Sequence, residues 1–410
     1  MSNAFNDSPH KDGMTGDEVA TDFNRTVVLP KPGSGPSGDR APGRGNSVPE
    51  RRKELEDIVR GVNVNPYINL DLDASPELES ALDAVDVRYR ELSAFAQGGT
   101  ATLSIARDRN LKRLVAIKSL KMDSPNITEL LNSFITEAKV TAQLDHPGVI
   151  PIYGLSRDAD NGIHLVMKLV NGKTLREYLR NTVMNYRIRG IDAFDENMQL
   201  RKRLEIFLRV CDTIVYAHHR GVIHRDLKPE NIMIGEFMEV FVMDWGLAKV
   251  ILKGENCPPS EQKISGTPRY FPPEVLRGEP LDFRSDIFTL GLILQEIATL
   301  QYAIAGNTEK DIINHGLHAD IEPIEHQFKW KIDRALQSII RKATAYRLED
   351  RYQTAEALAE DVRRYMAGLP LSTEKEKPLD RFLRFVFERV LKIRDAGASG
   401  APTGHGGFQI

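Results

Sequence analysis

A short run near the middle of the 410-residue chain brings together side chains that suit phosphoryl transfer. The run spans His224–Asn231 and reads His-Arg-Asp-Leu-Lys-Pro-Glu-Asn, and Asp244 follows thirteen residues later. Phosphoryl transfer requires that phosphates be held, that a metal neutralise their charge, and that the attacking hydroxyl be positioned in line. Carboxylate and amide oxygens suit Mg²⁺, and lysine ammonium groups suit phosphate. The residues of this region therefore supply one group for each of these tasks.

The run His224–Asn231 resembles the catalytic loop of protein kinases at every defining position. The resemblance implies that Asp226 orients the substrate hydroxyl or accepts its proton, and that Asn231 binds one Mg²⁺. Lys228 resembles the lysine found two residues after the catalytic aspartate in serine/threonine kinases, where it would bridge Asp226 and the γ-phosphate. Eight contiguous matches disfavour the alternative of a surface turn with an accidental charge cluster.

The stretch around Asp244 reads Val-Met-Asp-Trp-Gly-Leu-Ala-Lys and resembles the Asp-Phe-Gly motif of the same family. Asp244 would chelate the Mg²⁺ that bridges the β- and γ-phosphates. Trp245 replaces the usual phenylalanine, and we expect the larger indole to fill the same hydrophobic position under the helix that carries Glu137.

Upstream, the sequence Val-Ala-Ile-Lys ending at Lys118 resembles the strand whose lysine contacts the α- and β-phosphates. Glu137 lies 19 residues later on an expected helix and is the expected ion-pair partner of Lys118. Either residue alone would be an ordinary solvated side chain. Their spacing, ahead of the Asp-His-Pro sequence that begins at Asp145, favours the functional interpretation.

The glycine-rich loop departs from the family pattern. Protein kinases place three glycines here because the backbone must approach the phosphates closely. Only Gly98 is kept, whereas Ala96 and Ala101 occupy the first and third positions. We therefore expect a weakened grip on the nucleotide.

The adenine site is expected between the lobes. Met167 occupies the gatekeeper position, and the backbone groups of Lys168 and Val170 would bond the adenine edge. Ala116 above and Met233 below would sandwich the ring, although apolar residues there are also expected in a core. The full predicted nucleotide-binding set is Ala96, Gly98, Leu103, Ala116, Lys118, Glu137, Met167, Lys168, Val170, Met233 and Asp244.

The segment from Asp244 to Glu274 resembles an activation segment. Its end reads Pro-Pro-Glu where the family has Ala-Pro-Glu, and Glu274 should pair with Arg351. Thr267 matches the threonine that contacts the catalytic aspartate and lysine in serine/threonine kinases. Asp286 resembles the buried aspartate that ties down the backbone of the catalytic loop.

Arg225 is a cation that a phosphate on the activation segment neutralises in many relatives. Ser260 and Ser265 are the candidates for phosphorylation, with Thr267 disfavoured by its other task. Glu261 could supply a fixed negative charge instead.

The hydrophobic pattern predicts the elements that position these residues. Short strands are expected at 103–106, 114–118 and 164–170, a helix at 127–144, and mostly helices from 172 to about 366. This pattern fits an α+β fold of two lobes: a small antiparallel sheet with one helix, and a larger, mainly helical lobe. The predicted regions are a disordered tail at 1–50, a charged and partly helical extension at 51–88, a kinase domain at 89–368 with lobes at about 89–167 and 171–368, a linker with a basic amphipathic helix at 369–395, and a disordered tail at 396–410.

Composition excludes several classes of protein. With 41% hydrophobic and 28% charged residues the chain reads as soluble and globular, and a net charge of −3 gives no reason to expect nucleic acid as a partner. Two cysteines are too few for a disulfide framework. Since neither a signal peptide nor a transmembrane run is evident, we expect a cytoplasmic location.

The resemblance covers Tyr89 to Gly368 and is strongest to the bacterial, eukaryotic-like (Hanks-type) serine/threonine protein kinases. It implies ATP with Mg²⁺, or Mn²⁺ in its place, protein substrates with Ser or Thr acceptors, a signalling role, and self-association for trans-autophosphorylation. Two alternatives stay open: a pseudokinase scaffold with impaired ATP binding, and a small-molecule kinase. The basic helix expected at 379–394 would dock on the domain or a partner, lie on a membrane surface, or approach a missing transmembrane segment.

Overall fold

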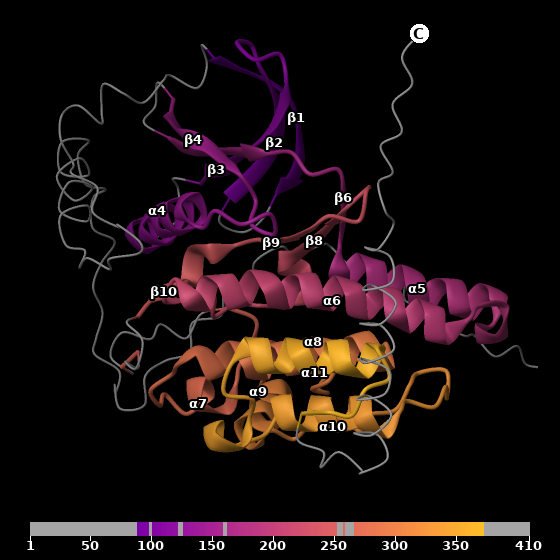
Figure 1. Ribbon diagram of the computed structural model, residues 1–410. Helices are drawn as coiled ribbons and strands as arrows, with labels where there is room; N and C mark the ends of the chain where they lie inside the picture. Colours follow the sequence, from indigo (N-terminus) through magenta and orange to yellow (C-terminus); the bar gives the residue numbers. More distant parts are fainter. Residues whose placement is uncertain are drawn as a thin grey trace, which may run out of the picture.

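The computed structural model describes residues 88–97, 101–121, 126–158, 162–251, 257–258 and 266–372, of which 91–97 are described by their backbone. These residues form a small lobe built on a sheet and a larger lobe built mainly of helices (Figure 1). This arrangement confirms the two-lobed α+β fold expected from the sequence. The predictions for 1–87 and 373–410, and those for Gly98, Ser260, Glu261 and Ser265, lie outside the described residues, and the predicted domain boundaries stay predictions.

The small lobe is an antiparallel five-stranded sheet in the order β1-β2-β3-β5-β4. The strands are β1 Tyr89–Gln97, β2 Ala101–Asp108, β3 Leu114–Leu120, β4 Ile152–Arg157 and β5 Ile163–Lys168. β5 ends two residues before the predicted strand does. The chain leaves the sheet there to cross into the large lobe, where β6 begins at Gly172.

The helix α4 (Ile127–Gln143) packs on this sheet. Its residues Leu131, Phe134 and Ala138 recur at the spacing of one helical face, and all are buried in a cluster that also holds Ala116 and Leu165 of the sheet. The predicted helix at 127–144 is therefore confirmed to within one residue. Burial of this face fixes the position of α4 relative to β3. These two elements carry Glu137 and Lys118, respectively.

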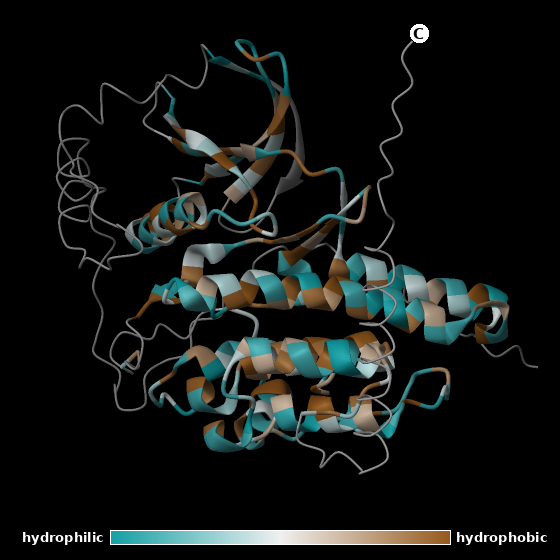
Figure 2. Ribbon diagram, viewed as in Figure 1, coloured by the Kyte–Doolittle hydropathy of each residue, from teal (hydrophilic) through white to brown (hydrophobic). Residues whose placement is uncertain are grey.

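The large lobe is organised around α8, in which every residue from Ser285 to Thr299 is buried. The hydropathy colours alternate along α6, which has one face on this core and one toward solvent (Figure 2). The helices of the lobe are α5 Leu175–Arg189, α6 Glu196–His219, α7 Pro273–Leu276, α8 Phe283–Thr299, α9 Glu309–His318, α10 Arg334–Ala343 and α11 Ala355–Met366, and the short 3₁₀ turns are η1 Ile191–Ala193, η2 Pro229–Asn231, η3 Trp245–Leu247, η5 Pro268–Tyr270 and η6 Leu348–Asp350.

The large lobe also contains two small antiparallel sheets, in the orders β6-β8-β9 and β10-β7. Their strands are β6 Gly172–Thr174, β7 Val222–Ile223, β8 Ile232–Gly235, β9 Val240–Val242 and β10 Lys249–Val250. The run His224–Asn231 therefore connects β7 to β8, and Asp244 follows β9. Among the described residues, no helix is both long and apolar enough to cross a membrane.

Candidate active site

The loop that connects β7 to β8 is fixed from below by Asp286 of α8. Its carboxylate accepts hydrogen bonds from the backbone N–H groups of His224 (2.9 Å) and Arg225 (3.0 Å) and lies 2.9 Å from Nε2 of His218. Burial opposes ionisation of Asp286, but the contacts with His218 and His224 outweigh it, so the pKa of Asp286 lies below its usual value. Arg225 has φ of 69°, a conformation that costs a non-glycine residue about 1–2 kcal/mol. The predicted role of Asp286 in tying down this backbone is confirmed.

Asp226 projects from this loop with two donors on one carboxylate oxygen. Lys228 Nζ donates to Oδ2 at 2.9 Å, and Asn231 Nδ2 donates to the same atom at 3.0 Å and to the Asp226 carbonyl at 2.8 Å. All three side chains are buried. Burial raises the pKa of Asp226, as does the nearby carboxylate of Asp244, whereas Lys228 opposes the shift. The cluster therefore holds a buried carboxylate with its donors on one side.

The other oxygen of Asp226 faces Gly266. A Cβ at position 266 would lie 2.8 Å from Oδ1 of Asp226, and Gly266 has φ of +127°, which side chains rarely tolerate. Glycine is thus required at the point where the activation segment passes the carboxylate. Next to it, Oγ1 of Thr267 accepts a hydrogen bond of 3.2 Å from Lys228 Nζ. Lys228 therefore bridges Asp226 and Thr267.

Lys118 of β3 forms the ion pair expected with Glu137 of α4. The distance from Nζ to Glu137 Oε2 is 2.6 Å, and a second carboxylate oxygen, Oδ1 of Asp244, lies 3.7 Å away. Burial disfavours the charged lysine, but the attraction of Glu137 and Asp244 outweighs it, so the pKa of Lys118 lies above its usual value. Three elements that are distant in sequence thus meet at one cation.

Asp244 and Trp245 are held by the core beneath α4. Asp244 has φ of 63° in the left-handed region. The indole of Trp245 is fully buried in the cluster that includes Val140 of α4, with its ring centroid 4.5 Å from that of His224. Its Nε1 donates to the Val242 carbonyl at 3.2 Å. The tryptophan therefore fills the position under the helix that was predicted for it.

A direct hydrogen bond also joins α4 to this segment. Ser133 Oγ donates to the carbonyl of Gly246 at 2.8 Å. On the other side, the Val242 N–H donates to the Gly148 carbonyl at 2.8 Å, and Val149 bridges to Val242. Residues of the small lobe thus contact the segment that carries Asp244 from both sides.

Most of the predicted adenine-binding residues meet on one face of the sheet. The strand register pairs Leu103 with Lys118 and Ala116 with Met167, and Leu103, Ala116, Met167 and Val170 belong to one hydrophobic cluster. Ala96 pairs with Leu103 through the backbone, and Ala101 begins β2. Met233 lies in β8 of the large lobe and is half-buried. The N–H of Lys168 donates to the Pro151 carbonyl at 2.9 Å.

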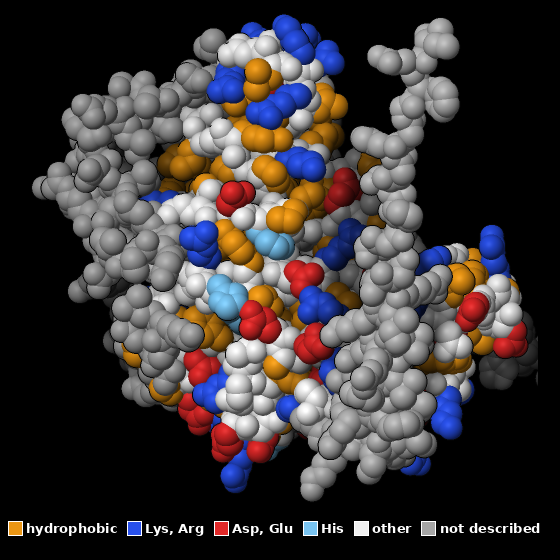
Figure 3. Space-filling model, viewed as in Figure 1, with side chains coloured by type: hydrophobic (Ala, Val, Ile, Leu, Met, Phe, Trp, Pro, Cys, Tyr) orange, Lys and Arg blue, Asp and Glu red, His pale blue; other side chains and the backbone are white. Residues whose placement is uncertain are grey.

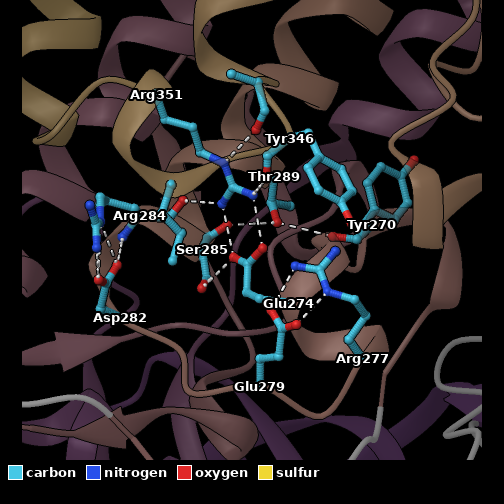
Figure 4. Close-up of polar contacts among 12 residues, drawn as sticks. Tyr270, Glu274, Arg277, Glu279, Asp282, Arg284, Ser285, Thr289, Tyr346 and Arg351 are labelled. Carbon is cyan, nitrogen blue, oxygen red and sulfur yellow. Dashed lines mark hydrogen bonds and ion pairs between the residues drawn. The ribbon is translucent and has the colours of Figure 1, made fainter.

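The end of the activation segment is anchored by the predicted ion pair. Arg351 Nη1 and Nη2 each donate to one oxygen of Glu274 at 2.8 Å, and both side chains are buried (Figure 4). Ser285 Oγ donates to Glu274 at 2.8 Å, and the remaining donors of Arg351 reach backbone carbonyls, including Ala345 at 2.7 Å. Thr289 of α8 donates to the Tyr270 carbonyl at 3.0 Å. These bonds fasten the segment that follows Thr267 onto the core.

Sequence reasoning missed Arg176, at the start of α5. Its guanidinium contacts Glu230 of the catalytic loop at 2.7 Å, Glu296 of α8 at 2.8 Å and the hydroxyl of Tyr270. One buried arginine thus connects the catalytic loop, the activation segment and the central helix. A helical arginine carries no motif of its own, and its nearest partner in sequence is 54 residues away. Gly266 likewise has no specific signal in the sequence, because its importance depends on its approach to Asp226.

The chain is similar to known protein kinases over most of its described length. A model of the protein kinase domain family matches residues 89–362. The serine/threonine-protein kinase PknD of Protochlamydia amoebophila (strain UWE25) is 31% identical over 299 residues, which are 68% of this chain and 30% of that protein. The PknD of Chlamydia abortus (strain DSM 27085 / S26/3) is 33% identical over 306 residues, 70% of this chain and 32% of that protein.

The chain thus spans about a third of the length of these curated relatives. The family match covers more than half of the chain and includes every described residue of the site above. The resemblance that the sequence motifs indicated is confirmed: this chain belongs to the protein kinase domain family.

Proposed function

We propose that this protein is a serine/threonine protein kinase that transfers the γ-phosphate of ATP to Ser or Thr hydroxyls of proteins. The observation that carries the proposal is the cluster in which Asp226, Lys228 and Asn231 meet Thr267 of the activation segment. The similar proteins from Protochlamydia amoebophila and Chlamydia abortus are serine/threonine-protein kinases by name, which favours the same activity.

Asp226 would orient the acceptor hydroxyl and take up its proton. Its Oδ2 already receives Lys228 and Asn231, so Oδ1, on the side of Gly266, is the oxygen available to the substrate. The raised pKa that burial gives Asp226 makes its carboxylate a better proton acceptor than an exposed one. Lys228 would hold the carboxylate and approach the transferred phosphate.

Lys118 would contact the α- and β-phosphates, with Glu137 fixing the position of its ammonium group. Because its pKa is raised, Lys118 carries its charge throughout the neutral range. Ala116 and Leu103 from the small lobe and Met233 from the large lobe would enclose the adenine. Met167 would limit the depth of that pocket, with Lys168 and Val170 bonding the adenine edge through the backbone, and Ala96 and Gly98 would lie over the phosphates.

Asn231 and Asp244 are suited to hold Mg²⁺, or Mn²⁺ in its place. The amide nitrogen of Asn231 is engaged by Asp226, which leaves the amide oxygen as the ligand atom. No group of three His, Cys, Asp or Glu side chains with metal-site geometry occurs in the described part of the chain, and Mg²⁺ held together with phosphates needs only one or two such ligands. When bound, the ion would neutralise charge on the β- and γ-phosphates.

The acceptor class follows from Lys228 and Thr267, whose contact resembles that of serine/threonine kinases. We also propose that the protein acts in cytoplasmic signalling and phosphorylates itself in trans. The buried Cys211 is a free thiol, as suits a reducing compartment. The membrane or partner contact proposed for 379–394 would add a means of localisation.

The test compares the intact chain with an Asp226→Asn variant, using γ-labelled ATP with Mg²⁺ and a generic protein substrate. We expect label on Ser and Thr of the substrate, lowered about 10²–10⁴-fold in the variant by loss of the proton acceptor. Labelling of an aminoglycoside but not of protein would favour a small-molecule kinase. Nucleotide-independent partner binding without any labelling would favour a pseudokinase.

A further inference from the structure

The outer end of the small lobe carries an exposed basic surface around the turn between β2 and β3. In Figure 3 Lys and Arg side chains gather at the top of the small lobe, with hydrophobic ones among them. Leu111 is 60% exposed and Leu114 46% exposed, which is high for leucine side chains held in or next to a sheet. We call the following six exposed residues the hairpin surface: Arg90, Arg107, Arg109, Leu111, Lys112 and Leu114.

The strand register places these residues side by side. Arg90 pairs directly with Arg107, and Arg107 pairs directly with Leu114. Directly paired residues point to the same face, about 5 Å apart, and like charges in such a pair repel each other. None of the four cations forms an ion pair with another described side chain. The hairpin surface is therefore suited to attract a negatively charged group from outside the described residues.

The turn itself is rigid. The buried Asp108 accepts hydrogen bonds from the N–H groups of Asn110 (3.0 Å) and Leu111 (3.1 Å), and it pairs with Arg88 at 3.4 Å. The guanidinium of Arg113 lies 3.5 Å from the ring centroid of Tyr153. Asp108 thus neutralises Arg88 and Arg113 but not the four cations of the hairpin surface. The hydrogen-bonded turn holds Leu111 away from the core.

The stretch of sequence immediately before β1 is complementary to the hairpin surface in charge and in apolar side chains. Residues 71–86 contain no Lys, Arg or His. Their acidic residues are Asp71, Asp73, Glu77, Glu79, Asp83 and Asp86, and their leucines are Leu72, Leu78 and Leu82. We propose that residues 71–86 dock on the hairpin surface of the same chain, acidic groups against its cations and leucines against Leu111 and Leu114.

Residues 71–86 are covalently linked to the hairpin surface, which favours them over any ligand that is free in solution. Asp86 lies four residues before Arg90, and each extended residue spans about 3.3–3.6 Å, so the segment can reach the turn. A tethered ligand of this length experiences an effective concentration on the order of millimolar. An anionic lipid surface has matching chemistry, but it would have to displace the tethered segment.

The test uses a fluorescent peptide of residues 68–87 and full-length proteins, with binding followed by anisotropy. A segment variant replaces the six acidic residues of 71–86 by Asn or Gln, which frees the surface. A hairpin variant adds Arg107→Gln, Arg109→Gln and Lys112→Gln to it. A matched control instead adds Lys310→Gln, Lys331→Gln and Arg334→Gln, three exposed cations of the large lobe. A cooperative thermal unfolding transition in each would establish that all four proteins are folded.

We expect the peptide to bind the segment variant and the control equally. Binding should be at least tenfold weaker to the hairpin variant, which lacks the cations, and to the wild type, whose own segment occupies the site. Added salt should weaken it, because exposed charges are screened over about 10 Å at 0.1 M. Equal binding to the hairpin variant, equal binding to the wild type, or no binding to the segment variant would overturn the proposal. So would wild-type sedimentation with phosphatidylserine vesicles as strong as that of the segment variant, which would assign the surface to a membrane.

Discussion

At the scale of single residues, the site keeps charges buried by matching each with a fixed partner. Lys118 lies between Glu137 and Asp244, and Lys228 lies between Asp226 and Thr267. Removing a partner from a buried charge costs more than the pair itself contributes. Substitutions in these clusters should therefore change chemistry and local order together, and conservative variants are needed to separate the two effects.

Variants of Thr267 can separate an effect on chemistry from an effect on local order. Thr267→Val keeps the shape but removes the acceptor for Lys228, a hydrogen bond to a charged group worth about 1.5–3 kcal/mol. We expect kcat to fall roughly tenfold or more, with KM for ATP unchanged because the nucleotide contacts lie elsewhere. Thr267→Ser keeps the hydroxyl and should retain most of the activity. Steady-state kinetics decide, and a Ser variant as impaired as the Val variant would contradict the role of the hydroxyl.

His146 predicts a pH dependence of stability. Its Nδ1 accepts the Gly148 N–H at 3.0 Å, and burial lowers its pKa below the usual value near 6.5. The folded state therefore holds fewer protons on this ring than the unfolded state below about pH 6.5, and stability is lost as the pH falls through that range. His146→Asn supplies a carbonyl acceptor that does not titrate. Between about pH 7.5 and about pH 5.5, the unfolding midpoint of the wild type should fall further than that of the variant. A difference in midpoint that stays the same at both pH values would refute this.

Residue spacing predicted the geometry of the charged centre well, because its residues lie in short local runs. Asp226, Lys228 and Asn231 span one loop, and the pairing of Lys118 with Glu137 was predictable from a strand followed by a helix. Arg176 and Gly266 were not predictable in the same way. Their importance depends on atoms brought close only by folding, such as Oδ1 of Asp226, and no local pattern records that proximity.

At the scale of elements, α8 is the base on which the site is built. It carries Asp286, which holds the catalytic loop, and Ser285 and Thr289, which hold the activation segment. Because every residue of α8 from Ser285 to Thr299 is buried, these contacts cannot shift without disturbing the core. The sequence pattern predicted helices in this region but could not identify one of them as central, since that depends on how the others pack around it.

The anchoring pair of Glu274 and Arg351 gives a quantitative test at this scale. Arg351→Met leaves Glu274 as an uncompensated buried carboxylate, and we expect about 3–5 kcal/mol of lost stability in urea unfolding. The matched control is Arg284→Met, which removes a partly exposed pair with Asp282 and should cost about 1 kcal/mol or less. Equal losses in the two variants would show that burial of the Glu274 pair is not what anchors the segment.

At the scale of the whole molecule, the proposed nucleotide site draws its residues from both lobes. Lys118 and Ala116 come from the small lobe, and Asn231, Met233 and Asp244 from the large one. The lobes meet through the Ser133 contact with Gly246 and the bridge between Val149 and Val242. A ligand bound between them should therefore stabilise both.

We expect a non-hydrolysable ATP analogue with Mg²⁺ to raise the unfolding midpoint. At a hundredfold excess over Kd the stabilisation is about 2.7 kcal/mol. Lys118→Met should abolish the shift, whereas Lys173→Met, at an exposed lysine of the large lobe, should not. A wild type without any shift would indicate that the alanines at positions 96 and 101 of the nucleotide loop have removed ATP binding.

The most direct test of the central claim is transfer of phosphate to a protein hydroxyl at the expense of ATP. The Asp226→Asn chain, whose own activity should be lowered about 10²–10⁴-fold, would be offered together with a generic protein substrate to wild-type enzyme and Mg-ATP. Phosphosites would be mapped by mass spectrometry. The account predicts phosphoserine and phosphothreonine on the added protein only when wild-type enzyme is present. Absence of phosphorylated Ser or Thr on the added protein, or equal phosphorylation without the wild type, would contradict it.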